Sequence, residues 1–395
     1  MDTSVWWIFL AVTFLIGIFS QIYLLAAFSV MLAVVGLLAQ YWQMRVLKNI
    51  RYIRRPFYWR GFPEEQVSVQ FEVENRKFLP VTWLRIDDPW PLALAPEQDG
   101  LITRTENPGY GIITNLFSLR WYERSRQTIS IRLKQRGIYM LGPARLEAGD
   151  LFGIFSSVTE QSTVDFLTVF PEQMDFETLR LPANDPFGDR RARRRIFEDP
   201  IYPVGVRNYH PEDGFRRVHW PATAHTGELK SRIFQPVSAQ VMMVCLNVST
   251  FPHYWEGTYP ELLEHLVRVA SAVIQRALQD GYRVGLISNG CLAHADQPFR
   301  LPPGRSPQQL ARLLEALAGV TPFATASFED FLTYEMRQLP FGSTVVVVTG
   351  LWSPQLLEIL SSLKRHGHSV SLLLFSTQPT PRLNGVHILH QPFNG

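Results

Sequence analysis

The chain of 395 residues is long enough for two or three domains that each bury a core of their own. Its hydrophobic content of 46% is ordinary for a globular protein, its formal net charge is +3, and its two cysteines, Cys245 and Cys291, agree with a reducing compartment. The sequence contains no nucleophile elbow, P-loop or dinucleotide-binding fingerprint, so it offers no motif of the enzyme classes that depend on them.

The N-terminal segment is apolar. Residues 5–42 carry no charged side chain, and one polar break at Ser20-Gln21 divides them into two runs. Each run approaches the roughly 20 residues that a membrane-spanning helix needs. The pattern predicts a transmembrane helical hairpin over residues 1–42, in contact with the bilayer through residues 5–42. A buried helix pair in a soluble protein is the alternative, whereas Asp2 and the lack of a basic residue before the run disfavour a cleaved signal peptide.

A basic juxtamembrane segment follows over residues 43–62. Six cations lie between the apolar run and the next acidic residue, Glu64: Arg45, Lys48, Arg51, Arg54, Arg55 and Arg60. Because basic residues this close to a membrane helix stay on the cytoplasmic side, we expect both termini and all soluble domains in the cytoplasm. Apolar residues at near-helical spacing in the same segment also indicate an amphipathic helix that lies on anionic headgroups.

Residues 63–175 are typical of strands. The stretch QVSVQFEVENR alternates apolar and polar residues, and TISIRLKQRGIYML does so again after a break at Arg136-Gly137. Period-two alternation with turn residues between the runs predicts a β-rich, sandwich-like domain.

Residues 176–200 are predicted to be a linker, with five arginines between Arg190 and Arg195. A solvated connector beside an anionic membrane is the favoured interpretation. The alternative is a binding site for anionic lipid or nucleic acid, although the run is short and holds no aromatic residue for base stacking. We therefore expect no specific nucleic-acid partner.

Residues 239–395 alternate buried strands with amphipathic helices. Continuous apolar strands such as AQVMMVCLNVS and STVVVVTG alternate with helices such as YPELLEHLVRVASAVIQRALQDG. This order predicts a doubly wound α/β domain, in which binding sites lie beyond the carboxyl ends of the strands.

The segment 201–238 carries a family resemblance. The stretch GVRNYHPEDGFRRVHWPATAHTGELKSRIF resembles the signature of the domain-of-unknown-function 58 family. The residues that match the signature are Arg207, Tyr209, Pro211, Asp213, Arg217 and Trp220, with the pair Thr223-Ala224 after them. Upstream, RGIYMLGPARLEAGDLFGIF resembles a second motif of the same family. His225 and Leu151 depart from the family pattern, which usually has Arg and Pro there.

The resemblance implies a membrane-anchored protein with a von Willebrand factor A-like C-terminal domain. Members are often encoded beside a MoxR-type AAA+ ATPase, and no biochemical activity is established for the family. The resemblance thus implies a protein partner of that ATPase type.

A metal site is one candidate at the edge of the α/β sheet. Von Willebrand factor A domains that bind Mg²⁺ place Asp-x-Ser-x-Ser after their first strand, which supplies the oxygen ligands that a hard cation prefers. Here the ligand positions hold Asn247, Ser249 and Phe251, and the later strand ends in Thr349 and Gly350. Because both carboxylates are missing, we expect a degenerate site that binds no metal, and we expect no other cofactor.

The signature segment is the second candidate. His210, Asp213 and His219 could serve a metal-dependent hydrolase, but their spacing matches no short zinc signature. The favoured interpretation is a structural or partner-binding joint, with Trp220 as its apolar anchor.

The sequence therefore predicts a membrane-anchored, non-enzymatic adaptor or scaffold whose α/β domain binds a protein partner. The rivals are the hydrolase and a lipid or nucleic-acid binder that uses the arginine run.

Overall fold

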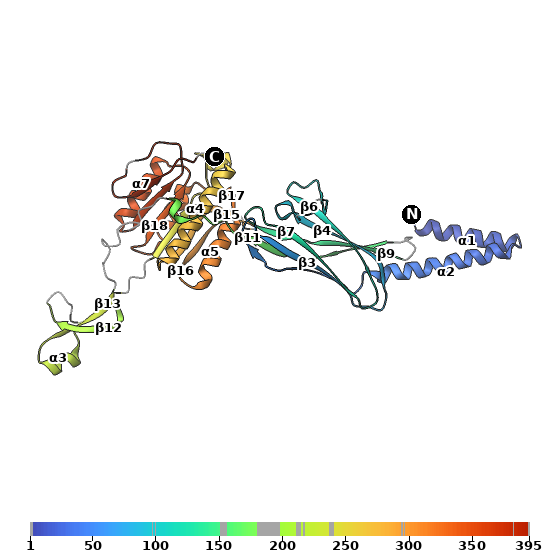
Figure 1. Cartoon of the computed structure of the whole chain (residues 1–395), viewed down its shortest axis with the longest axis horizontal. Coiled ribbons are helices and arrows are strands. Elements are labelled where there is room, and N and C mark those ends of the chain that lie inside the picture. Colours follow the sequence, from blue (N-terminus) through green and yellow to red (C-terminus); the bar gives the residue numbers. More distant parts are fainter. Residues whose placement is uncertain are drawn as a thin grey trace. The chain divides into compact units, whose positions relative to one another are not determined.

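The computed structural model describes residues 3–96, 98, 100–150, 156–179, 198–210, 215, 218–236, 241–293, 295, 297–381 and 383–393. The chain divides into two compact units, Met1–Glu172 and Gln173–Gly395 (Figure 1). Each unit is described by itself.

The first unit begins with two apolar helices, α1 (Thr3–Phe19) and α2 (Tyr23–Val46). They pack against each other through small residues: a side chain at Gly17 would meet the backbone of Ala26 at 2.7 Å. Ser29 Oγ donates a hydrogen bond to Thr13 Oγ1 at 3.1 Å across the pair. By length and hydropathy α2 could cross a membrane, and α1 contains a shorter apolar stretch.

The rest of the first unit is built from strands. These are β1 (Ile50–Pro56), β2 (Arg60–Gly61), β3 (Gln66–Asn75), β4 (Val81–Pro91), β5 (Ile102–Arg104), β6 (Tyr110–Leu119), β7 (Arg124–Arg132), β8 (Gly137–Leu141), β9 (Ala144–Gly149), β10 (Ser156–Gln161) and β11 (Asp165–Val169), with a short 3-10 helix η1 (Leu92–Leu94) after β4. They form three sheets with the orders β1-β3-β7, β10-β9-β4-β6-β5 and β2-β11-β8.

The three sheets share one core, as the period-two pattern predicts. In β3 the alternate residues Val67, Val69, Phe71 and Val73 are all buried. Phe71 lies edge-on to the buried ring of Trp90, with the ring centroids 5.8 Å apart. Val46, the last residue of α2, is buried in the same core. The prediction of a mostly β region is confirmed.

The amphipathic helix that we expected within residues 43–62 is wrong. From Ile50 onward the segment is strand β1, which pairs antiparallel with β3 from Ile50↔Asn75 to Pro56↔Val69. Side-chain burial alternates along this segment as expected for a strand: Tyr52 and Arg54 are buried, whereas Arg51 and Arg55 are exposed. A spacing that also suits a helix is satisfied here by strand pairing.

The second unit is an α/β unit with an additional ribbon. Its elements are η2 (Phe176–Leu179), β12 (Glu198–Asn208), α3 (Trp220–Thr226), β13 (Lys230–Pro236), β14 (Val241–Leu246), η5 (Tyr254–Glu256), α4 (Pro260–Gln279), β15 (Arg283–Leu292), β16 (Pro298–Gly304), α5 (Pro307–Gly319), β17 (Val320–Ala324), α6 (Phe328–Met336), β18 (Thr344–Thr349), α7 (Pro354–Arg365), β19 (Ser369–Leu374) and β20 (His387–His390). Seven strands form one sheet in the order β16-β15-β14-β18-β19-β20, with β17 paired to β15. Strands β14, β15, β18, β19 and β20 run parallel, and β16 and β17 are antiparallel.

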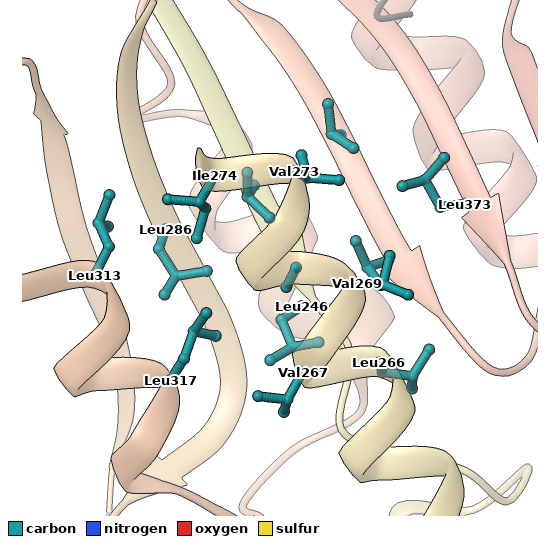
Figure 2. Close-up of a cluster of buried hydrophobic side chains, with 14 of the residues drawn as sticks. Leu246, Leu266, Val267, Val269, Val273, Ile274, Leu286, Leu313, Leu317 and Leu373 are labelled. Atoms are coloured by element: carbon teal, nitrogen blue, oxygen red, sulfur yellow. The ribbon is translucent and has the colours of Figure 1, made fainter. Parts of the chain in front are cut away.

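Helices cover both faces of this sheet. Along β14, Val244 and Leu246 enter the core that α4 and α5 close, whereas Met243 and Cys245 enter the core beneath α6 and α7. Figure 2 shows the first of these cores, with Leu266 and Val273 of α4 over the strands. Strands buried on both faces explain the continuous apolar runs in the sequence. The prediction of a multi-domain chain with a β-rich part and an α/β part is confirmed.

The segment 201–238 contributes a ribbon of its own. Strands β12 and β13 pair antiparallel with Arg207↔Ser231, and among the described residues they form a two-stranded sheet by themselves. The predicted arginine run, Arg190–Arg195, and the signature residues Pro211, Asp213 and Arg217 lie outside the described residues.

Candidate functional site: the carboxyl edge of the α/β sheet

Four polar residues meet at the carboxyl edge of the sheet. Asn247 and Ser249 follow β14, Thr349 ends β18, and Asn289 lies in β15 next to them. All four are buried. Because the carboxyl ends of neighbouring parallel strands meet at one edge, the degenerate metal positions that we singled out come together there.

These four side chains form hydrogen bonds with one another and with neighbouring backbone groups. Asn247 Nδ2 donates to Thr349 Oγ1 at 3.0 Å, and Asn247 Oδ1 accepts from the backbone N of Ser249 at 2.9 Å. Asn289 Oδ1 accepts from the backbone N of Val248 at 2.9 Å, and its Nδ2 donates to Ser249 Oγ at 3.1 Å. Thr349 Oγ1 in turn donates to the carbonyl of Leu351 at 2.7 Å. We call these four residues the edge network.

The edge network is neutral and closed. Each amide spends both its oxygen and its nitrogen on protein partners, so the oxygens are engaged as hydrogen-bond acceptors. A hard divalent cation prefers carboxylate ligands, and the network supplies none. Within the part of the chain that the structure describes, no three His, Cys, Asp or Glu side chains are grouped to hold a metal ion.

The other two predicted metal positions, Gly350 and Phe251, do not take part in the edge network. A side chain at Gly350 would come within 2.7 Å of Leu262 Cδ2, so glycine lets the end of β18 pack closely on α4. Phe251, where a metal-binding domain has its last hydroxyl, is partly exposed at the rim.

An aromatic loop forms that rim. It spans residues 251–259, between β14 and α4, and we call it the rim loop. The imidazole of His253 stacks on Trp255 with the ring centroids 4.6 Å apart, and Tyr254 meets Trp255 edge-on at 5.0 Å. Trp255 remains 68% exposed. The loop is closed at its base, where Thr250 Oγ1 accepts from the backbone N of Tyr259 at 2.7 Å.

The signature segment forms a small folded element around α3. His219 is the N-cap of α3, and its Nδ1 accepts a hydrogen bond from the backbone N of Ala222 at 3.0 Å. Thr223 Oγ1 donates to the carbonyl of His219 at 3.1 Å and accepts from the backbone N of Lys230 at 3.0 Å. One ring nitrogen of His219 is therefore committed to capping the helix.

The predicted burial of Trp220 is wrong. It is the first residue of α3 and is 61% exposed, because the helix has only 7 residues and none of its side chains is buried. Arg207 and His210 are also exposed, and Tyr209 is partly buried beside Phe215, with the ring centroids 5.9 Å apart. The buried anchor of this segment is Val218, which bridges to Ser231.

Comparison with known proteins places this segment in a family. Residues 205–377 match the family described as "Protein of unknown function DUF58". This region belongs to the DUF58 family. The matched region of this DUF58 protein runs from β12 through the ribbon and α3 to the segment that follows β19. It thus includes both the signature segment and the edge network.

A curated relative is similar over part of the DUF58 chain. "Uncharacterized protein YeaD" of Bacillus subtilis (strain 168) is 23% identical over 226 residues, which are 56% of this chain and 54% of the relative. The chain spans about half the length of the curated relative that it matches.

Some solved structures resemble smaller parts of the chain. The CARDB domain of the PF1109 protein from Pyrococcus furiosus is 13% identical, covering 30% of this chain and 91% of that one, with a TM-score of 0.20. Spo0M, a sporulation control protein from Bacillus subtilis, is 11% identical, covering 32% of this chain and 51% of that one, with a TM-score of 0.19. At these scores the likenesses carry no argument about function.

Sequence reasoning missed the rim loop and the role of Asn289 in the DUF58 region. The rim loop has a visible signal, since FPHYWEGTYP follows a buried strand and holds four aromatic residues and a histidine in ten positions. Asn289 has a weaker one: it stands at the carboxyl end of a predicted strand, but its hydrogen-bond partners lie 40 and 41 positions away along the chain.

A histidine behind the rim loop is held neutral. The imidazole of His265, on α4, lies 4.7 Å from the ring of Phe375 and 5.3 Å from that of Phe393, measured between ring centroids. Burial, and secondarily the charge of Arg268, lowers the pKa of His265 below its usual value. His265 therefore packs as an aromatic residue at neutral pH, and it supports the apolar character of this edge.

Proposed function

We propose that this DUF58 protein is a membrane-anchored, non-enzymatic adaptor whose α/β unit, a von Willebrand factor A-like domain, binds a protein partner at its carboxyl edge. The observation that carries the proposal is the closed edge network beneath an exposed aromatic rim. Exposed Trp and Tyr side chains are typical of protein-binding hot spots, and here they lie on a loop that is closed at its base. The polar groups beneath the loop are already paired, so they do not favour a bound metal.

Membrane anchoring is supported by α1 and α2. We propose that both helices insert as a transmembrane hairpin, because they pair through small residues and form a hydroxyl hydrogen bond between Ser29 and Thr13 across the pair. Close backbone approach at small residues and hydrogen bonds between helices are how apolar helices associate within lipid. The basic residues after α2 favour a cytoplasmic location for the soluble units.

The topology can be tested with reporter fusions. We expect reporters fused after residue 60 and at the C-terminus to report a cytoplasmic location, because the cations begin at Arg45, in the last turn of α2, and continue beyond the helix. A reporter inserted at Ser20-Gln21, between the helices, should read the opposite side. A non-cytoplasmic signal from either of the first two fusions contradicts the hairpin.

The partner that the family resemblance suggests is a MoxR-type AAA+ ATPase. We expect Trp255→Ala to reduce its co-purification with the detergent-extracted full chain at least fivefold, since truncating a central aromatic hot spot costs over about 1 kcal/mol of binding free energy.

Phe341→Ala is the matched control for this experiment. Phe341 is 76% exposed and precedes β18, so it lies at the opposite edge of the same sheet. It should leave co-purification unchanged. Equal losses for the two variants, or no loss for Trp255→Ala, would rule out the carboxyl edge as the binding surface.

The rival functions gain no support from the described residues. The hydrolase needs His219, whose Nδ1 caps α3, together with Asp213, which lies outside the described residues. The arginine run of the lipid or nucleic-acid binder lies outside them as well. Both remain predictions from the sequence alone.

A further inference from the structure

Two tight turns lie where α2 enters the β-rich unit. One joins β3 to β4 over residues 76–80, and the other joins β6 to β7 over residues 120–123. The backbone N of Arg76 donates to the carbonyl of Asn49, three residues beyond the end of α2, at 3.0 Å. The turns are tied to each other, because the buried Asn75 donates from its Nδ2 to a carbonyl of each turn at 2.8 and 2.9 Å.

These turns hold three aromatic rings in solvent. Phe78 and Trp121 are 71% and 58% exposed, and Tyr122 beside them is exposed as well. The rings of Phe78 and Trp121 stack on each other with centroids 5.5 Å apart and planes 4° apart. Neither ring belongs to the core of the unit. Large rings that are rigidly displayed and add nothing to the core indicate a contact surface.

Helix α2 sets how far these turns lie from its own apolar part, because the end of the helix is fixed to the β-rich unit. Val46 at the end of α2 is buried in the β core, and Gln43 both donates to the carbonyl of Ser156 at 2.7 Å and accepts from Ser157 Oγ at 2.9 Å. The apolar run of α2 ends at Tyr41 and Trp42, residues that usually lie at the membrane interface. At about 1.5 Å per helical residue, Val46 is only about 6 Å further along the helix axis than Trp42.

The charge around the rings is mainly positive. Lys48, Arg51, Arg76, Lys77 and Arg120 lie in or beside the two turns. The nearby acidic residues are engaged: Glu74 pairs with Arg76 at 2.7 Å and with Arg124 at 3.0 Å, and the carboxylate of Glu123 accepts from the backbone N of Arg120.

Lys77 stands out among these cations. Its ammonium is enclosed and has no hydrogen-bond partner among the residues that the structure describes, and burial lowers the pKa of Lys77 to about 8. Because the enclosed ammonium lacks an acceptor, rotation of the flexible side chain outward to an anionic oxygen outside the chain would supply one.

We propose that these two turns form a membrane-docking surface, with the rings of Phe78, Trp121 and Tyr122 at the acyl boundary and the cations, Lys77 among them, at anionic lipid phosphates. Amphipathic rings and basic side chains are the groups that bind a bilayer interface. The inference rests on the proposed membrane anchoring. Its consequence is that the β-rich unit is held against the bilayer by its own surface as well as by α2.

Nitroxide labels on single introduced cysteines of the full chain test this surface. The native Cys245 and Cys291 are buried, so they compete little for the label. The positions are Trp121→Cys, Tyr58→Cys as a control in the exposed loop between β1 and β2 at the other end of the unit, and Leu37→Cys on the exposed side of α2. Phe78→Cys replaces Trp121→Cys if that variant folds poorly. The protein is reconstituted in phosphatidylcholine vesicles with and without phosphatidylglycerol.

We expect the label at 121 to be several-fold less accessible to a water-soluble nickel complex, and more accessible to oxygen, than the label at 58. If 121 is as water-accessible as 58 while 37 reports hydrocarbon, the docking surface is wrong and the anchoring holds. If 37 is also aqueous, the anchoring itself is wrong. If 121 is shielded equally in detergent and shows dipolar broadening between chains, the surface binds a second copy and the proposal fails.

The charge component has its own matched pair. In Lys77→Gln the additional shielding of the label at 121 on adding phosphatidylglycerol should shrink several-fold. In Lys134→Gln, which removes an exposed lysine after β7 at the other end of the unit, it should persist. An equal response in the two variants overturns the role of Lys77.

Discussion

Replacing Asp88 with alanine is expected to destabilise the β-rich unit by up to about 3–5 kcal/mol, because it removes the bidentate partner of the buried Arg54. The arginine then keeps the contacts of its Nη1, with Asp165 at 3.1 Å and with the carbonyl of Thr163 at 3.3 Å. Arg54 Nε and Nη2 donate to the two oxygens of Asp88 at 2.7 and 2.8 Å, and the side chains are 2% and 0% exposed. Tyr52 donates from its hydroxyl to the same carboxylate at 2.8 Å. Chemical denaturation of the full chain in detergent would measure the loss.

Two further variants control for loss of charge alone. Arg55→Ala removes an exposed arginine from the same strand, and Arg126 still pairs with its partner Glu72 at 3.0 Å, so the cost should stay within about 1 kcal/mol. Arg54→Met combined with Asp88→Leu should cost less than Asp88→Ala alone, since it leaves no unpaired charge in the core, and Asp165, which loses its contact with Arg54, is partly exposed to solvent. Equal losses for Arg55→Ala and Asp88→Ala would contradict a special role for the buried pair.

This ion pair also explains why the segment after α2 was misassigned from the sequence. The six cations of this segment look alike in the sequence. Only the alternation of strand β1 separates the buried Arg54 from the exposed Arg51 and Arg55. The partner that makes burial tolerable, Asp88, lies 34 residues away on another strand. Burial of a charge is decided by such a distant partner, which no local pattern reveals.

The α/β unit was predictable because its central strands are buried on both faces. Runs such as VMMVCL and TVVVVT have no polar face, and each is followed by turn residues and an amphipathic helix. The sheet strands that escaped prediction lack this signature. PFRLPPG in β16 contains three prolines and is an antiparallel strand beside β15, and HILH in β20 has only four residues. Prolines are tolerated there because an edge strand need not donate on both sides.

The same contrast holds for the candidate site. That Asn247, Ser249 and Thr349 meet follows from the parallel arrangement of β14 and β18. That they close into a hydrogen-bonded network depends on Asn289 and on side-chain orientations that strand order does not fix. For Trp220, a large apolar residue in a polar segment suggested burial, whereas α3 is too short to bury any of its side chains.

The edge network makes a second prediction with a large effect. Asn289→Leu should destabilise the α/β unit by about 2–6 kcal/mol, since it orphans two buried groups, the backbone N–H of Val248 and Ser249 Oγ, at about 1–3 kcal/mol each. Asn384→Leu, at an exposed turn of the same unit, should change stability by less than about 0.5 kcal/mol. Denaturation of the full chain in detergent, with both variants measured alongside the parent, gives the comparison.

If the edge network were instead kept for binding a ligand, replacing its residues should not lower the stability of the α/β unit. Polar groups kept for a ligand are held at a cost to stability, so replacing them leaves a protein as stable as before or more so, and the ligand raises the melting temperature of the parent by mass action. If the edge network is structural, excess Mg²⁺ leaves the melting temperature of the parent unchanged, and Asn289→Leu melts well below it. A parent that Mg²⁺ stabilises, together with an Asn247→Ala variant that keeps its stability but loses this response, would restore the metal site that the missing carboxylates argue against.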